Sequence, residues 1–151
     1  MVSVRPVHGA DFDAWLPLWQ GYNAFYGRHG ATALPDRITQ ATWERFLDPD
    51  EPVFGLVACD GDRLLGLAHC LFHRSTTRFE LTCYLQDLFT LDSERGRGVG
   101  RALIEAVYEQ ARRAGIQRVY WQTHETNAAG RMLYDKMARH VGFIVYAHDV
   151  F

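Results

Sequence analysis

No apolar run in this 151-residue sequence approaches the ~20 residues that a bilayer span requires; the longest one near its middle is Val53–Cys59. The first residues, Met1–Pro6, lack the apolar stretch of a secretory signal. No C-x-x-C pair occurs, and all three cysteines lie in apolar, strand-like segments, which is typical of buried reduced thiols (Cys59, Cys70 and Cys83). We therefore expect a cytoplasmic protein with no membrane partner.

An excess of charge of either sign is also missing. Sixteen Lys and Arg residues against 18 Asp and Glu residues give a formal charge of −2 and a pI of about 6.4. Non-specific nucleic-acid binding rests on neutralisation of phosphates by clustered cations, so we expect no direct nucleic-acid partner. His69 and His73 share i,i+4 spacing, which separates them by ~13 Å along a strand. No other His, Cys or carboxylate cluster has ligand spacing, and no metal site is predicted.

The length is that of about one domain, and the composition is 48% hydrophobic and 23% charged, as in ordinary globular proteins. There is no linker, repeat or low-complexity stretch, so residues 1–151 are expected to form a single domain. Apolar patterns and turn residues predict strands at 2–7, 53–59, 64–72, 82–91, 119–123 and from 143 to 146. Helices are predicted from Asp11 or Asp13 to about residue 26, and at 39–47, 98–114 and 128–137. This order predicts a mixed sheet with helices on its faces.

The segment from Arg95 to Arg101 is rich in glycine and arginine, and it joins a predicted strand to the longest predicted helix. Glycines there expose consecutive backbone N–H groups, and a helix start adds unpaired donors and partial positive charge. The segment is therefore a candidate pyrophosphate site, to which Arg95, Arg97 and Arg101 add charge. A tight turn without a ligand stays open as an alternative. The spacing fits neither the dinucleotide fingerprint nor a P-loop.

Three motifs together resemble those of the GNAT N-acetyltransferases. The first is Arg95-x-x-Gly98-x-Gly100, the second runs from Asn127 to Tyr134, and the third is Gly142-Phe143. The resemblance spans nearly the whole chain and is greatest to the histone- and polyamine-acetylating branch. It implies a GNAT fold of the α/β class: a central twisted mixed, mostly antiparallel sheet of six or seven strands, flanked by about four helices.

The resemblance also implies acetyl-CoA as cosubstrate, held where a bulged fourth strand splays from the fifth. Main-chain groups of the fourth strand would bind the pantetheine arm, and the glycine turn would cradle the pyrophosphate. The residues implied to bind the cofactor are Leu88, Phe89, Thr90, Arg95, Gly96, Arg97, Gly98, Val99, Gly100, Arg101, Asn127, Gly130 and Tyr134. Asn127 equally suits a helix N-cap.

Tyr134 is the predicted general acid, because a phenol with a pKa near ~10 is well matched to a thiolate leaving group. The base is open. In the polyamine-like branch a Glu can stand at the position of Gln86, and Gln86 cannot serve. Asp87, His124 and Glu125 remain candidates, beside a chain of water molecules.

The implied function is acetyl transfer to a primary amine, either a polyamine-like small molecule or a lysine of a basic protein tail. An acyl-CoA-binding or sensor domain with little turnover is the alternative, favoured by Gln86. Several aromatic residues could line a substrate cleft, although an aromatic stripe at helical spacing is more often core: Trp19, Tyr22, Phe25, Tyr26 and Trp43. Few residues follow Gly142, so a homodimer that completes the sheet is expected, with exchange of the C-terminal strands as one form of it; a short final hairpin or a missing strand is the alternative.

Overall fold

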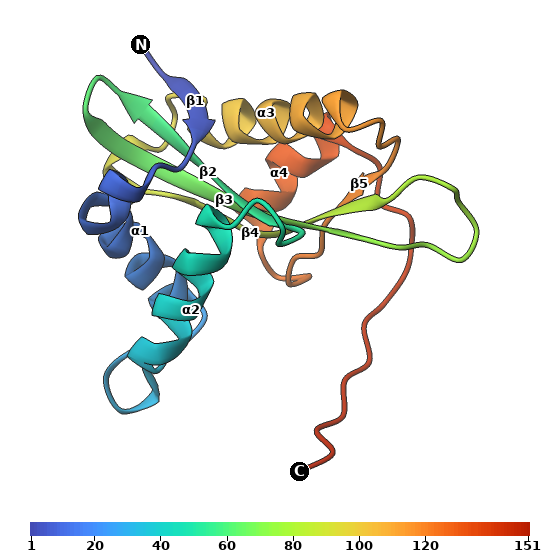
Figure 1. Ribbon diagram of the computed structural model, residues 1–151, viewed down its shortest axis with the longest axis horizontal. Helices are drawn as coiled ribbons and strands as arrows, with labels where there is room; N and C mark the ends of the chain where they lie inside the picture. The colour runs from blue at the N-terminus through green and yellow to red at the C-terminus, as the bar shows by residue number, and fades with distance from the viewer.

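A five-stranded sheet in the order β1-β2-β3-β4-β5 forms the centre of the computed structural model, which describes residues 1–151 (Figure 1). The strands are β1 (Ser3–Pro6), β2 (Val53–Asp60), β3 (Arg63–His73), β4 (Thr82–Thr90) and β5 (Val119–Tyr120). The first four strands pair antiparallel, and β5 pairs parallel with β4. The predicted mixed, mostly antiparallel sheet is confirmed.

Two helices cover each face of the sheet (Figure 1). They are α1 (Phe12–Phe25) and α2 (Asp36–Leu47) on one face, and α3 (Val99–Arg113) and α4 (Ala128–Met137) on the other. Short 3-10 turns precede α1, α2 and α3 at Gly9–Asp11, Gly30–Thr32 and Asp92–Glu94. All four predicted helices are therefore confirmed, α2 beginning three residues earlier than expected. None of the helices is both long and apolar enough to cross a membrane.

Helix α3 packs its apolar stripe against one face of the sheet. Its buried residues are Val99, Leu103, Ile104, Val107 and Ala111. Burial of one such aliphatic side chain contributes roughly 1.5–3 kcal/mol, so this stripe anchors α3 firmly. The helix is bounded by two glycines in the left-handed region, Gly98 with φ 79° and Gly115 with φ 73°. The position of α3 fixes the preceding glycine turn against the end of β4.

Aromatic residues of α1 and α2 fill the other face. The ring of Trp15 lies 4.7 Å from that of Trp43 and 5.8 Å from that of Trp19, and all three are buried. The helical aromatic stripe is thus mainly core, as such stripes usually are. Its C-terminal end differs: Phe25 and Tyr26 are exposed, and Tyr26 lies beside the end of β4. The three cysteines are buried and free, as expected.

The predicted strand from 143 to 146 is wrong, and the sheet has five strands rather than six or seven. Residues 138–151 run as extended chain away from the body of the molecule and pair with no strand (Figure 1). Strand β5 also ends at Tyr120 rather than at residue 123. β-structure requires a hydrogen-bonded neighbour. Residues 143–146 lie along no edge of the sheet, and β5 ends early because it pairs with β4 only at Val119 and Tyr120.

Candidate active site

A β-bulge shapes the middle of β4. The β3–β4 register pairs His69 with Asp87 but Cys70 with Leu85, which leaves Gln86 without a partner. A bulge of this kind bends the strand and changes the face toward which the following side chains point. Leu85 therefore packs in the core beneath α3, whereas Asp87, two residues later, faces His69 on the side of α1. Without the bulge both side chains would share one face.

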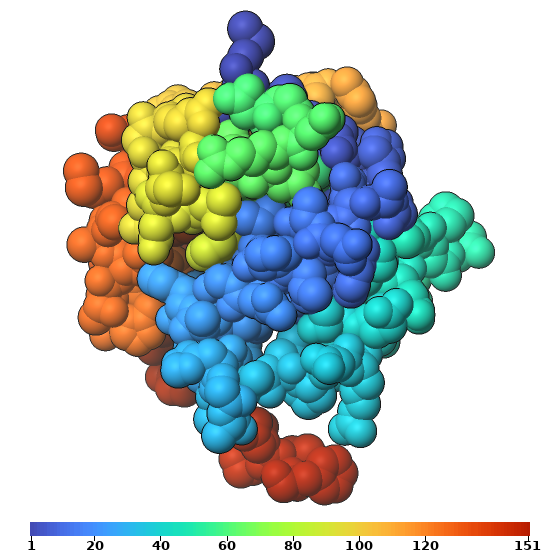
Figure 2. Space-filling view, turned by 90° about the vertical axis from the view of Figure 1, so that its left-hand side faces the viewer, coloured from blue at the N-terminus to red at the C-terminus, as the bar shows by residue number.

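Beyond Tyr84, β4 and β5 separate. The two strands pair only at Cys83–Val119 and Tyr84–Tyr120, so the β5 side of β4 has no strand partner from Leu85 to Thr90. A hollow opens at this point, where β4, the end of α1 and the α4 region meet (Figure 2). Its lining is Tyr22, Tyr26, Leu85, Gln86, Leu88, Trp121, Gln122, Thr123 and Tyr134. The bulge and the splayed strands that the sequence resemblance implied are thus present.

Tyr134 reaches this hollow from α4. Its ring stands edge-on to that of Trp121, with 5.6 Å between the ring centres. Burial raises the pKa of the Tyr134 phenol, and the neighbouring Tyr26 adds to the rise. A phenol is protonated at neutral pH even at its ordinary pKa, and the upward shift leaves it in the state that a general acid needs.

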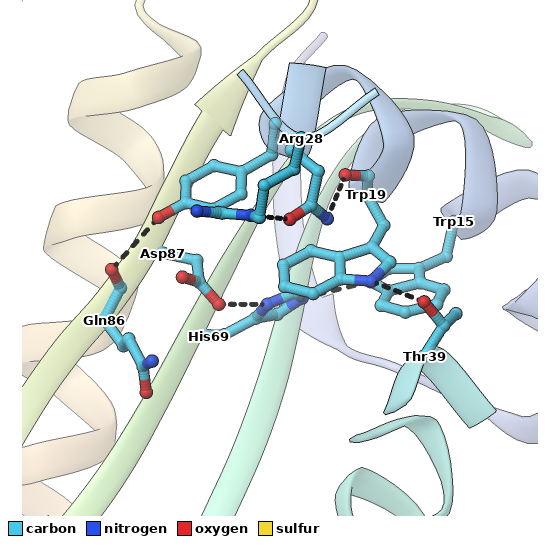
Figure 3. Close-up of polar contacts among 9 residues, drawn as sticks. Trp15, Trp19, Arg28, Thr39, His69, Gln86 and Asp87 are labelled. Atoms are coloured by element: carbon cyan, nitrogen blue, oxygen red, sulfur yellow. Dashed lines mark hydrogen bonds and ion pairs between the residues drawn. The ribbon is translucent and has the colours of Figure 1, made fainter. Parts of the chain in front are cut away.

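Asp87 is held by a chain of two buried hydrogen bonds (Figure 3). The Nε1–H group of Trp15 donates to Nε2 of His69 at 3.0 Å, and Nδ1 of His69 lies 2.9 Å from Oδ2 of Asp87. An indole N–H can only donate, so Nε2 is the acceptor and Nδ1 carries the proton that is donated to Asp87. The Asp87 side chain is 11% exposed and that of His69 is 3% exposed. The carboxylate therefore has one fixed oxygen and one oxygen available to a further partner.

Tyr22 connects this carboxylate to the hollow. Its hydroxyl donates a long hydrogen bond of 3.5 Å to the main-chain carbonyl of Gln86. Burial, together with the negative charge of Asp87, raises the pKa of the Tyr22 phenol well above its usual range. A neutral hydroxyl thus lies between the hollow and the carboxylate, where it can pass a proton in either direction.

The glycine turn before α3 carries six consecutive free donors. None of the backbone N–H groups from Gly96 to Arg101 donates a hydrogen bond within the protein. Gly96 and Gly98 have φ values of 83° and 79°, and no atom lies within 4 Å of where a Cβ would stand on either. Donors of this kind at the start of a 15-residue helix suit an anion such as pyrophosphate. Gly100 also packs closely, since a Cβ there would lie 3.1 Å from Leu133.

The arginines of the turn are engaged to different degrees. Arg97 binds Glu94 at 2.5 Å and Asp60 at 2.8 Å, and Glu94 is itself buried and paired with Arg63. This network ties the turn to the β2–β3 hairpin, so the structure gives the Arg97 side chain a structural role. Arg95 and Arg101 make only exposed contacts, with Asp92 and Glu105, and remain free to meet phosphates.

The other sequence candidates lie in the turn before α4. His124 is exposed and hydrogen-bonded to Thr126, Glu125 is exposed, and neither lines the hollow. Asn127 caps α4: its side chain accepts from the amide of Gly130 at 3.2 Å and donates to Thr123 at 2.9 Å. The structure thus brings Tyr134 to the hollow, holds Asp87 beside Tyr22 on the side of α1, and leaves His124 and Glu125 outside the hollow.

Sequence reasoning missed His69 and Trp15 as neighbours of the site. The sequence gives no signal for either, because the bulge at Gln86 and the packing of α1 on the sheet bring them to Asp87. Tyr22 and Tyr26 were considered as cleft residues, and the helical spacing of the stripe was the only available sign of their location.

Comparison with known proteins identifies relatives over the whole chain. Residues 15–138 match the family model described as "Acetyltransferase (GNAT) family". The chain is 34% identical over 151 residues to D-amino-acid N-acetyltransferase HPA3 of Saccharomyces cerevisiae, covering 98% of this chain and 91% of that protein. It is 30% identical to mycothiol acetyltransferase of Geodermatophilus obscurus, over 99% of this chain and 46% of that protein.

Solved structures show the same fold. Aminoglycoside N-acetyltransferase AAC(6')-Iy in complex with CoA aligns over 100% of this chain and 96% of its own, with a TM-score of 0.82 and 18% identity. A transcriptional regulator from Bacillus halodurans aligns over 99% of both chains with a TM-score of 0.83 and 17% identity. Sequence identities this low show only that these proteins share the fold.

Proposed function

Because the chain belongs to the acetyltransferase (GNAT) family, we propose that it transfers the acetyl group of acetyl-CoA to a primary amine at the hollow between β4 and β5. The observation that carries this proposal is the arrangement around one splayed strand pair: a phenol, Tyr134, in the hollow, a fixed carboxylate, Asp87, beside Tyr22, and six free backbone donors beyond the end of β4. Each part supplies something that acetyl transfer to an amine requires.

The free backbone N–H groups of residues 96–101 would bind the pyrophosphate, with Arg95 and Arg101 adding positive charge. The unpaired edge of β4, at Leu88, Phe89 and Thr90, would bind the pantetheine arm through main-chain groups. Asn127 would contribute to cofactor binding through the N-terminal end of α4, which it caps. Glycine is required at position 130 because a Cβ there would lie 2.4 Å from the Asn127 side-chain amide.

When bound, acetyl-CoA supplies the thioester carbonyl at which the amine forms its new N–C bond. Tyr134 holds a phenolic proton for the sulfur as the C–S bond breaks, which avoids expelling a free thiolate. Asp87 accepts the proton lost by the amine, directly or through the hydroxyl of Tyr22. His69 keeps the carboxylate oriented throughout. Exchange with solvent returns both groups to their starting states.

The acceptor is a primary amine. A polyamine-like small molecule or a lysine of a basic protein, as in the histone- and polyamine-acetylating branch, fits a carboxylate beside aromatic rings. The similarity to D-amino-acid N-acetyltransferase HPA3 adds amino acids to these candidates. A cytoplasmic location belongs to the same proposal, since the three thiols are free.

The experiment that tests the function is a coupled assay that detects the free CoA thiol while a panel of primary amines is offered with acetyl-CoA. We expect turnover by the wild-type protein and a fall in kcat of ~100-fold or more in Tyr134→Phe, because general acids contribute ~100- to 10,000-fold. Binding of acetyl-CoA without turnover on any amine would favour the acyl-CoA sensor instead.

We also propose that the protein is a homodimer in which the C-terminal segments are exchanged. Residues 141–151 expose apolar side chains, including Phe143 at 84% and Tyr146 at 88% exposure. The outer edge of β5 is open, and a hollow beside it is lined by four apolar and two polar residues: Tyr108, Ala111, Ile116, Val119, Arg112 and Gln117. The segment of a second copy would extend the sheet at this edge and fill the hollow.

Sedimentation equilibrium tests the dimer. We expect a dimer for the wild-type protein and a monomer for the double variant Phe143→Asp, Tyr146→Asp, whose charges oppose burial. A wild-type monomer across micromolar concentrations would contradict the proposal.

A further inference from the structure

Arg28 is a preorganised cation at the rim of the hollow. Its Nε donates to Oδ1 of Asn23 at 2.6 Å, and its backbone amide donates to the carbonyl of Asn23 at 2.8 Å. Asn23 is buried and anchored in turn to the carbonyl of Trp19 at 2.9 Å. A buried side chain thus fixes the guanidinium from behind.

The two Nη groups of Arg28 have no partner in the protein. No carboxylate lies within 4 Å of them, and the guanidinium carbon lies 5.9 Å from the ring centre of Tyr22 and 5.6 Å from that of Tyr26. Both rings line the hollow. In Figure 3 the free end of the guanidinium points toward the strand that carries Gln86 and Asp87. The two free Nη groups of Arg28 are therefore available to a ligand that binds beside Gln86 and Asp87.

The charges around Tyr22 are of opposite sign. The Asp87 carboxylate and the Arg28 guanidinium both act on the Tyr22 phenol, the first raising its pKa and the second lowering it. Helix α1 supports both charges from its buried side, through Trp15 and His69 to Asp87, and through Trp19 and Asn23 to Arg28 (Figure 3). A negative and a positive group are thus both held rigidly beside one tyrosine.

We propose that Arg28 binds the carboxylate of the acceptor, so that the acceptors of this protein are free amino acids whose α-amino group is acetylated. This inference rests on the proposed acetyl transfer and names its substrate class. A guanidinium with two free Nη groups matches the two oxygens of a carboxylate. The amine would lie on the side of Asp87. A polyamine would instead bring a second ammonium toward Arg28 and be repelled, as would a lysine flanked by other basic residues.

The test compares acceptors that differ only in the carboxylate. The purified wild-type protein is assayed with D-alanine, L-alanine, both alaninamides and spermidine, and the same panel is run on Arg28→Met and Arg28→Lys. Arg113→Met is the matched control, because Arg113 is 70% exposed on the far end of α3 and pairs only with Glu109.

We expect the wild-type protein to prefer at least one alanine enantiomer to its amide by 10- to 100-fold in kcat/KM, mainly through KM, as for a hydrogen-bonded charge pair. Arg28→Met removes that preference while its activity on alaninamide changes less than threefold, and Arg28→Lys restores part of it. Arg113→Met matches the wild type. The affinity for acetyl-CoA, measured by titration calorimetry, is unchanged in all variants.

Three results would overturn the inference. Equal use of alanine and alaninamide by the wild-type protein would mean that Arg28 does not recognise the acceptor's carboxylate. The proposed acetyl transfer would still stand. Loss of acetyl-CoA affinity in Arg28→Met would assign Arg28 to the cosubstrate. Failure of the wild-type protein to acetylate any amine, with acetyl-CoA bound, would remove the proposed function and this inference with it.

Discussion

The two sides of the hollow are built on opposite principles. On the α3 side, a short local segment leaves six backbone N–H groups without partners, and the glycines give the turn its shape. On the α1 side, each charged group is held by a buried polar side chain: His69 of the neighbouring strand holds Asp87, and Asn23 of α1 holds Arg28. In our proposal the first side binds the pyrophosphate as a generic anion site, and the second recognises one acceptor. Changes on one side should therefore leave the function of the other largely intact.

The largest effect is expected from the double variant Gly98→Glu, Gly100→Glu. A side chain at Gly98 strains a residue with φ 79°, one at Gly100 meets Leu133 at 3.1 Å, and two carboxylates repel phosphates. We expect the affinity for acetyl-CoA to fall by more than ~100-fold in titration calorimetry, because the pyrophosphate could no longer bind the six backbone N–H groups of residues 96–101.

Gly115→Glu is the matched control for that variant. Gly115 has φ 73° at the other end of α3, with nothing within 4 Å of a Cβ, so it carries a comparable strain and charge outside the turn. If the double variant binds acetyl-CoA with unchanged affinity, the glycine turn does not bind the cosubstrate and only connects β4 to α3.

A smaller effect is expected from His69→Leu. The substitution leaves Asp87 without its donor and the indole N–H of Trp15 without its acceptor. We expect kcat to fall ~10- to 100-fold, which is part of the ~100- to 10,000-fold that a general base contributes, while KM for acetyl-CoA stays the same. His69→Asn, whose amide can still donate to Asp87, should recover much of the loss.

His73→Leu controls for the loss of a histidine from β3. His73 is exposed and hydrogen-bonded to Tyr120, away from the hollow. If His69→Leu keeps full kcat, or if His69→Asn is no better, His69 acts only in packing.

The same contrast explains what the sequence could predict. The glycine turn, the extent of α4 and its Asn127 cap are local features, and local sequence predicted each of them. The bulge in β4 was implied only by the family resemblance, and the partners of Asp87 arise from pairing with β3 and packing of α1, so no residue near Asp87 indicates them. The missing final strand also depends on distant residues: residues 143–146 have strand composition, but a strand forms only when it pairs with a neighbour, and these residues do not lie along the open edge of β5.

A modest effect is expected from Glu94→Gln, which disturbs the ion pairs beside the glycine turn. Arg97 and Arg63 lower the pKa of the Glu94 carboxyl, so its charged form stabilises the fold above the ordinary carboxyl range and loses that effect as pH falls. The variant should melt several degrees below the wild type at pH 7, and the gap should close below pH ~4.5. Thermal unfolding followed by circular dichroism measures this.

The affinity for acetyl-CoA should change less than threefold in the same variant, because we propose that backbone groups rather than the Arg97 side chain bind the pyrophosphate. A loss of tenfold or more would instead assign the Arg97 guanidinium to the phosphates.

The smallest effect is expected from His124→Gln and Glu125→Gln, singly or together. Both side chains are exposed in the turn before α4, and neither lines the hollow or contacts Asp87. If the proton of the amine leaves toward α1, kcat/KM measured by release of the CoA thiol should stay within ~2-fold of the wild type, and the same should hold at lower pH. A loss of tenfold in either variant would place the base on the α4 side. The α1 side would then only bind the acceptor, and the division of roles between the two sides would have to be redrawn.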